Sequence, residues 1–94
     1  FAPKEVAERL TDLLLGHEPT AAAGFTSGEV QGYGAATVYR SVAEQIRGRT
    51  RLVEITVVGT EPDVRDLLAR LAEELPGRGI AYRICPLASA GTIA

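Results

Sequence analysis

The part of the sequence best suited to binding chemistry is the tripeptide Gly77-Arg78-Gly79, in which an arginine stands between two glycines. Successive backbone N–H groups in such a turn can form a concave anion site, and the guanidinium can act as a charge partner. The same residues also suit a turn between two elements, where glycine is needed for backbone reasons alone. The sequence therefore indicates either an anion-binding turn or a purely conformational one.

A second group of candidates is a basic stretch in the middle of the chain, where Arg40, Arg47, Arg49 and Arg51 lie close together. The last three have a spacing of two, which would put them on one side of an extended segment. Guanidinium groups pair bidentately with phosphate or carboxylate. The alternative is that they form a solvated loop or strand edge.

Soft-metal chemistry depends on His17 and Cys85, because the chain has one histidine and one cysteine. They have no metal-ligand spacing, so a site within one chain is not expected. A site shared between subunits, using His17 with Glu18 or another carboxylate, is the metal hypothesis that remains. Cys85 is interpreted as a buried small hydrophobic residue. No nucleophile-base spacing or phosphate loop is present, so we expect no enzyme activity.

Composition sets the broad class of the protein. A chain of 94 residues with 46% hydrophobic residues predicts one globular domain, covering residues 1–94. A net charge of −2 argues against nucleic-acid binding. One cysteine fits a reducing compartment, and neither a leader nor a long apolar run is seen, so we expect a cytoplasmic protein.

Periodicity then predicts the elements that position these residues. The first half contains a helix over residues 3–15, a loop over 17–23 and an extended segment over 24–33 with a bulge at Gly28. Residues 32–51 form a long, weakly patterned connection with a short helical turn at 41–46, and such connections are more often functional than idle.

The second half is more regular. Residues 52–58 are rich in β-branched side chains and predict a strand. Thr60 is expected to cap the next helix, with Asp63 three residues later. Residues 76–79 end that helix, and residues 80–87 are predicted to form the last strand.

This order predicts an α+β ferredoxin-like sandwich, βαββαβ, whose first strand is missing. In that fold the first strand lies inside the sheet, so its loss would leave unpaired backbone groups. Phe1 looks like the last residue of such a strand. We expect either that the sequence is truncated at its start or that another segment fills the gap.

Several stretches resemble the PII signalling proteins. Residues 24–34 are similar to that family's second strand and its entry into the long T-loop, and Glu54 lies in a segment that resembles the third strand. Gly77-Arg78-Gly79 resembles the B-loop. The order of small motifs is closer still to DUF3240, an uncharacterised PII-like family, which shows similar Gly32-x-Gly34, Ser41–Gln45 and Gly48-Arg49 patterns.

The resemblance implies a homotrimer with ligand sites in the clefts between subunits, and a T-loop-like segment at about 32–51. It implies a regulatory protein that binds a small ligand and controls membrane transport, with heavy-metal efflux the leading process and a transporter contacted through that loop. Ligand-binding candidates are Gly32, Gly34, Glu44, Gln45, Arg47, Arg49, Glu54, Gly77, Arg78 and Gly79. Glu44 and Gln45 could equally lie in an exposed turn.

The departures from the PII pattern weaken the expectation of an adenine nucleotide. Ala35 stands where PII proteins carry an arginine, and residues 77–80 lack the family's aspartate and lysine. The alternative function is a direct divalent-metal-binding trimer resembling the CutA family, and a nucleotide hydrolase is the least supported reading. Neither the ligand nor the partner is identified by the sequence.

Overall fold

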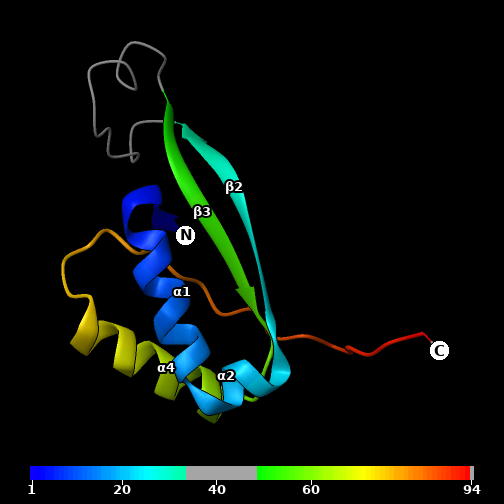
Figure 1. The fold of residues 1–94 in the computed structure, drawn as a ribbon. Helices are drawn as coiled ribbons and strands as arrows, with labels where there is room; N and C mark the ends of the chain where they lie inside the picture. Colours follow the sequence, from blue (N-terminus) through cyan, green and yellow to red (C-terminus); the bar gives the residue numbers. More distant parts are fainter. Residues whose placement is uncertain (34–48, 94) are drawn as a thin grey trace.

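The computed structural model describes residues 1–33 and 49–93, and in this part of the chain three helices lie on one side of a narrow antiparallel sheet (Figure 1). The predicted helical turn at residues 41–46 lies outside the described residues. The elements, in chain order, are β1 (Ala2–Pro3), the 3-10 turn η1 (Lys4–Val6), α1 (Ala7–Gly16), α2 (Glu18–Ala23), β2 (Phe25–Tyr33), β3 (Arg49–Val57) and α4 (Glu61–Glu74). The α+β class predicted from the sequence is confirmed.

The β2–β3 hairpin is the longest feature of the sheet. Its strands pair in one unbroken register from Phe25↔Val57 to Tyr33↔Arg49. Gly28 lies opposite Glu54 within this register, so the predicted bulge at Gly28 is wrong. The strand β3 begins at Arg49, earlier than the predicted start at Leu52, whereas β2 lies within the predicted segment 24–33. Both ends of the segment 32–51 are therefore strand residues.

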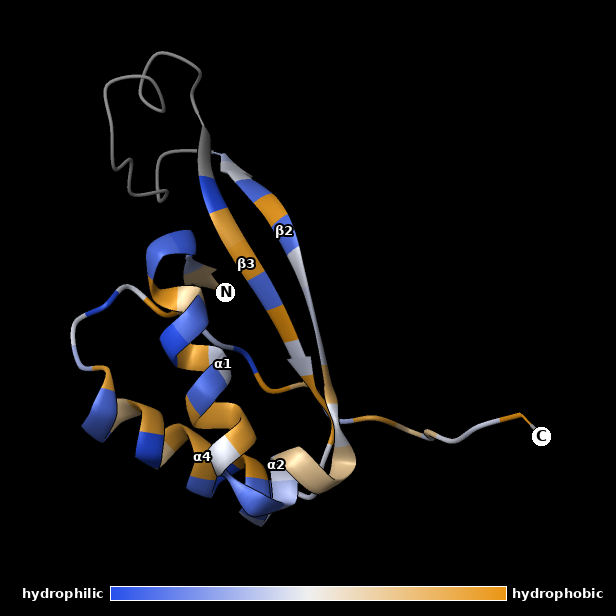
Figure 2. Cartoon of the chain, viewed as in Figure 1, coloured by the Kyte–Doolittle hydropathy of each residue, from blue (hydrophilic) through white to orange (hydrophobic). Residues whose placement is uncertain are grey.

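The core lies between the helices and one face of this hairpin. Leu10 and Leu14 from α1 and Leu67 and Leu75 at α4 are at most 4% exposed. Ile55, together with Phe25 and Val57, packs against them from the sheet. Along β3, apolar and polar positions alternate from Glu54 onward (Figure 2), which is the pattern of a strand with one face in the core.

Residues 17–23 do not form the predicted loop, because α2 occupies most of them. Pro19 lies in the first turn, where its missing N–H costs no hydrogen bond, and the following alanines have the highest helix propensity. The helix ends at Gly24, whose φ of 82° and ψ of 162° suit only glycine. This short helix turns the chain from α1 into β2.

The predicted cap of the last helix is confirmed. The backbone N–H of Asp63 donates to Thr60 Oγ1 over 3.3 Å, and Pro62 lies in the first turn. The helix ends at Glu74, next to the predicted break at residues 76–79. The N–H of Leu75 makes the last helical bond, to the carbonyl of Leu71, and the chain then turns at Pro76.

The front strand, which the sequence pattern lacks, is present as the two residues of β1. Ala2 pairs with Val53 and Pro3 with Leu52, so β1 lies beside β3 in the order β1-β3-β2. The N-terminal segment also contacts the chain after α4: the amino group of Phe1 donates to the carbonyl of Ala81 over 2.8 Å. The N–H of Ala81 donates back to the carbonyl of Phe1 over 2.9 Å.

The prediction of a strand over residues 80–87 is wrong. In the described chain the segment has no regular secondary structure, and its backbone pairing with the first residues stops at Ala81. Among the residues that the structure describes, no strand pairs with this segment beyond Ala81. The remaining residues run outward to the C-terminus (Figure 1).

No helix within residues 1–33 and 49–93 combines the length and the apolar character needed to cross a bilayer.

Candidate functional site

The Gly77-Arg78-Gly79 turn follows α4 and is exposed. Gly77 and Gly79 have φ angles of 66° and 75°, in the left-handed region that favours glycine. Arg78, between them, is also exposed. Both interpretations remain open, because positive φ explains the two glycines and an exposed guanidinium beside them suits an anion.

The hairpin carries the second group of candidates. Gly32 pairs with Thr50, next to the end of the hairpin, and Glu54 lies further along β3 opposite Gly28. Since Ile55 points toward the helices, alternation puts Glu54 on the opposite face of the sheet. Arg49 is the first residue of β3 and pairs with Tyr33 at the end of the hairpin. The candidates Gly34, Glu44, Gln45 and Arg47 lie outside the described residues.

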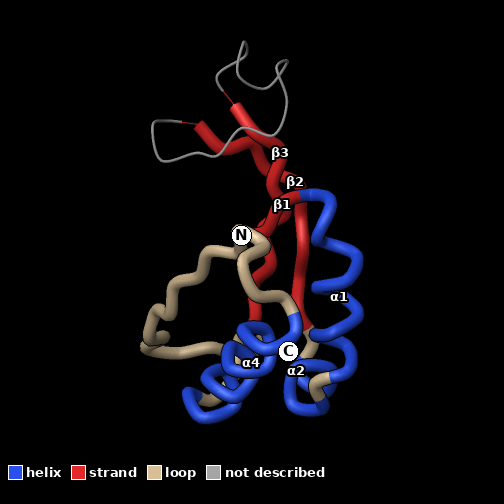
Figure 3. Tube along the Cα trace, turned by 90° about the vertical axis from the view of Figure 1, so that its left-hand side faces the viewer, coloured by secondary structure: helices blue, strands red, loops and turns tan. Residues whose placement is uncertain are grey.

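Among the described residues of one chain, the Gly77–Gly79 turn and the hairpin candidates lie apart (Figure 1). The end of the hairpin projects beyond the helices in both views (Figures 1 and 3), whereas the 77–79 turn lies on the helix side of the sheet (Figure 1).

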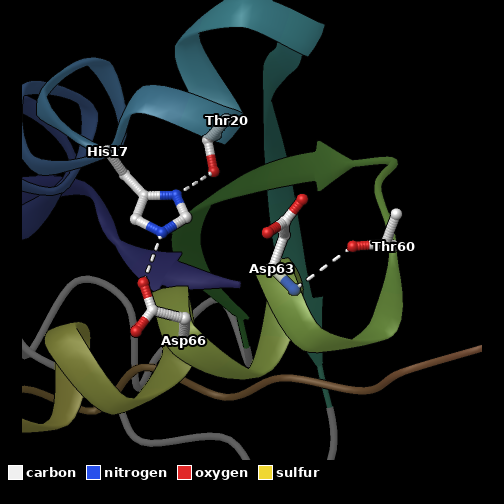
Figure 4. Close-up of polar contacts among 5 residues, drawn as sticks. All are labelled: His17, Thr20, Thr60, Asp63 and Asp66. Atoms are coloured by element: carbon white, nitrogen blue, oxygen red, sulfur yellow. Dashed lines mark hydrogen bonds and ion pairs between the residues drawn. The ribbon is translucent and has the colours of Figure 1, made fainter.

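His17, the metal candidate, is buried at 2% exposure between α1 and α2. Its Nδ1 lies 2.7 Å from Thr20 Oγ1, and its Nε2 lies 2.9 Å from Asp66 Oδ2 (Figure 4). Both ring nitrogens are therefore engaged, and a metal ion would have to displace one partner. Among the described residues no group of three or more His, Cys, Asp or Glu side chains could hold a metal ion.

The partners of His17 define its tautomer. A carboxylate only accepts hydrogen bonds, so Nε2 carries the proton and donates it to Asp66. In the neutral ring Nδ1 then accepts from the Thr20 hydroxyl. This Thr-His-Asp arrangement has the connectivity of a catalytic triad, but Thr20 is only 4% exposed, which closes its hydroxyl to a substrate. The arrangement ties α2 to α4.

A second polar contact joins the 3-10 turn η1 to the sheet. Lys4 Nζ lies 2.9 Å from Glu29 Oε1, and both side chains are about half or more exposed. The hydrogen bond and charge of Lys4 lower the pKa of Glu29, and the charge of Arg51 adds a smaller effect in the same direction. Because Ala2 and Glu29 both pair with Val53, this ion pair spans the central strand.

Two hollows of the described structure lie between β3 and the segment after Ala81. A groove of about 680 Å³ lies between the end of β3, the start of α4 and the segment after Ala81. Arg83 lines it, with its guanidinium 5.2 Å from the centre of the Phe1 ring, at cation–π distance. Cys85 also lines it and is exposed, so the prediction of a buried cysteine is wrong.

Several of these residues have no signal in the sequence. Thr20 follows His17 at helical spacing, but Asp66 lies in a distant helix, and only the fold brings it to the ring. Lys4 and Glu29 meet because the register of β1 and β2 on β3 aligns them. The groove lined by Arg83 and Cys85 is open because the backbone pairing between the first residues and the segment after α4 stops at Ala81. The pattern of side chains in the sequence does not indicate where this pairing stops.

Comparison with known proteins identifies a family for this chain. The family model described as "Protein of unknown function (DUF3240)" matches residues 1–94, and the chain belongs to this family. No curated protein matches it, and no solved structure matches it.

Proposed function

We propose that this chain is a PII-like regulatory protein that binds a small ligand between subunits and controls a membrane transport process. The fold part of the proposal is a ferredoxin-like sheet. With Phe1 bonded to Ala81, the segment that follows α4 lies outside β1, and the order across the sheet becomes β2-β3-β1-81. Counted as a fourth strand, this segment would give the strand order of a βαββαβ sandwich, which supports the ferredoxin-like proposal.

The observation that carries the proposal is the shape of the β2–β3 hairpin. Nine paired positions lead without a break to Tyr33 and Arg49, which flank residues 34–48. A stiff two-stranded arm that projects beyond the helices suits presentation of a connecting segment to a partner (Figure 1). In this proposal the segment at 32–51 contacts a membrane transporter, and heavy-metal efflux is the transport process that the family resemblance favours.

The proposed assembly is a homotrimer. The helices cover one face of the sheet, and the other face has no cover in the described residues (Figure 1). On that open face Val30 and Leu52 face each other across the hairpin, and Thr26 faces Thr56. Apolar and β-branched side chains on an uncovered sheet face suit packing against other subunits.

In the trimer the ligand would lie where the 77–79 turn of one subunit meets the base of the neighbour's hairpin. Arg78 supplies the positive charge, and the left-handed glycines beside it leave their N–H groups accessible. An anionic ligand is therefore expected. Binding would shift the 32–51 segment between two states only to the extent that the ligand binds one of them more tightly.

The test is native mass spectrometry of the chain with ADP, ATP, a cyclic nucleotide, bicarbonate, Zn²⁺ and Cu²⁺, each added separately. An anion retained by a trimer and lost in Arg78→Ala, but kept in Arg70→Ala on the exposed side of α4, supports the proposal. Uptake of a divalent metal in place of any anion would instead support a metal-binding trimer. Binding that is insensitive to Arg78→Ala would contradict the proposed site.

A further inference from the structure

The strand β2 forms a long edge of the described sheet. Its nine residues pair with β3 on one side, from Phe25 to Tyr33, and β2 is the last strand in the order β1-β3-β2. Among the described residues, no backbone hydrogen bond joins the other side of β2 to another segment. Such an edge presents a row of N–H and C=O groups to which a further strand can bond.

This edge lacks the features that usually protect an exposed edge strand from pairing. Natural edge strands are guarded by proline, by bulges or by charged side chains. The strand β2 has no proline, and its register with β3 is unbroken, so it has no bulge. Its one charged residue, Glu29, is bonded to Lys4, which follows β1 on the opposite side of β3. The edge is therefore open to an added strand.

The segment after Leu87 lies outside the body of the molecule. Residues 88–93 are exposed throughout and have no regular secondary structure. They leave the molecule past the end of the hairpin nearest α2, on the side of the sheet opposite the helices (Figure 1). Leu87 is 59% exposed and Ile93 is fully exposed. Residues 84–94 contain no charged side chain, and an uncharged, exposed segment with apolar side chains is typical of a surface that a partner covers.

We propose that residues 88–93 of one copy of the chain dock as an added strand on the outer edge of β2 in a second copy. This inference rests on the proposed assembly of identical subunits and names the surfaces that join them. In extended form residues 88–93 span about 20 Å, which fits within the roughly 30 Å of β2. The sheet of the same chain is a poor acceptor, because the segment runs away from it (Figure 1).

The side chains beside this edge leave room for a neighbouring strand. Gly28 and Gly32 lie on the open face of β2, and a Cβ placed at Gly28 would have no atom beyond its chain neighbours within 4 Å. The docking segment also has small residues, with Ala88, Ala90 and Gly91 among them. Small side chains on both strands allow their backbones to approach closely. A docked strand would also stiffen the hairpin that leads to residues 34–48.

The test changes only the docking segment, which contributes nothing to the core and can be altered without unfolding the domain. The double variant Ser89→Pro/Ala90→Pro puts a proline in both phases of the added strand, so one of the two removes an N–H that points to β2. The matched control, Ser89→Thr/Ala90→Val, puts β-branched residues at the same positions. The measurement is amide hydrogen exchange in the assembled protein.

In the wild type and the control, the alternate amides of β2 that do not bond to β3 should be protected from exchange. In the proline variant these outer amides should exchange about tenfold faster or more, while the amides that bond to β3 change little. Dilution of the wild type to the monomer should speed the same outer amides, since the added strand comes from a second copy.

Equal exchange of the outer amides in the proline variant and the control would overturn the proposal. Protection that persists on dilution to the monomer would place the strand in the same chain and would also overturn it. Sedimentation of the same samples tests the proposed function separately. A homotrimer in which the proline variant leaves β2 exchange unchanged contradicts this docking alone. An assembly of two copies in which the variant removes the protection supports the docking and contradicts the homotrimer.

Discussion

His17 and Asp66 are 49 positions apart in the sequence, and their side chains meet with Nε2 2.9 Å from Oδ2 (Figure 4). The histidine comes from the junction of α1 and α2, and the aspartate from α4. Because His17 is almost wholly buried, this contact joins the two helical parts of the layer that covers the sheet. The contact therefore has a structural role that can be measured.

Replacement of Asp66 by alanine removes the acceptor for the Nε2 proton of His17. The carboxylate is 67% exposed, so water can partly replace it. We expect Asp66→Ala to lower the free energy of unfolding by about 1 kcal/mol, measured by urea denaturation. Glu73→Ala, at another exposed position of α4, is the matched control. Equal midpoints for the two variants would contradict a stabilising contact.

The Thr20 hydroxyl faces the other ring nitrogen and is itself buried. Thr20→Val keeps the shape of the side chain but leaves Nδ1 without its donor, which should cost about 1–3 kcal/mol. Thr20→Ser retains the hydroxyl and should cost less. Nitrogen-15 NMR of the ring offers a direct check, since the wild type should show the tautomer protonated at Nε2. Protonation at Nδ1 in the neutral ring would show that the assigned hydrogen-bond directions are wrong.

The ion pair between Lys4 and Glu29 makes part of the stability depend on pH. The folded-state pKa of Glu29 is lowered, chiefly by the hydrogen bond and charge of Lys4. This contribution is therefore present above the unfolded-state pKa and is lost as the pH falls through the lower folded-state value. In Lys4→Met the pKa of Glu29 should rise toward its ordinary range, whereas Lys4→Arg should keep it low. An NMR titration of the Glu29 side chain that is unchanged in Lys4→Met would contradict this role.

The cap of α4 predicts a local effect. Thr60→Ala removes the acceptor for the Asp63 N–H and should cost about 1 kcal/mol, while Thr60→Ser should be close to wild type. Hydrogen exchange should quicken in the first turn of α4 more than in α1. A uniform change across both helices would indicate a global effect and not the loss of a cap.

The sequence predicts the parts of the fold whose signals are local. The leucine stripe of α1, the β-branched run in β3 and the Thr60 cap each depend on neighbouring residues, and the structure bears them out. The helix α2 is too short for periodicity to reveal. The segment at 80–87 has strand-like residues, but a strand also requires a partner, and β1 extends only two residues along β3.

The residues of the candidate site also fall into those with a local sequence signal and those brought together only by the fold. The glycines at 77 and 79 are recognisable because a turn with positive φ favours that residue type. The contact of His17 with Asp66 depends on how α4 packs, and no spacing in the chain reports it. The predicted ligand residues Gly32 and Arg78 lie on different parts of one chain, so their association remains a prediction about neighbouring subunits.

The measurement that tests the central proposal most directly is sedimentation equilibrium of the chain over a wide concentration range. A ligand site that joins the 77–79 turn to a neighbour's hairpin exists only in an assembly. The proposal predicts a stable species with three times the 10.0 kDa mass of the chain. A monomer at every concentration would contradict both the homotrimer and the ligand site between subunits.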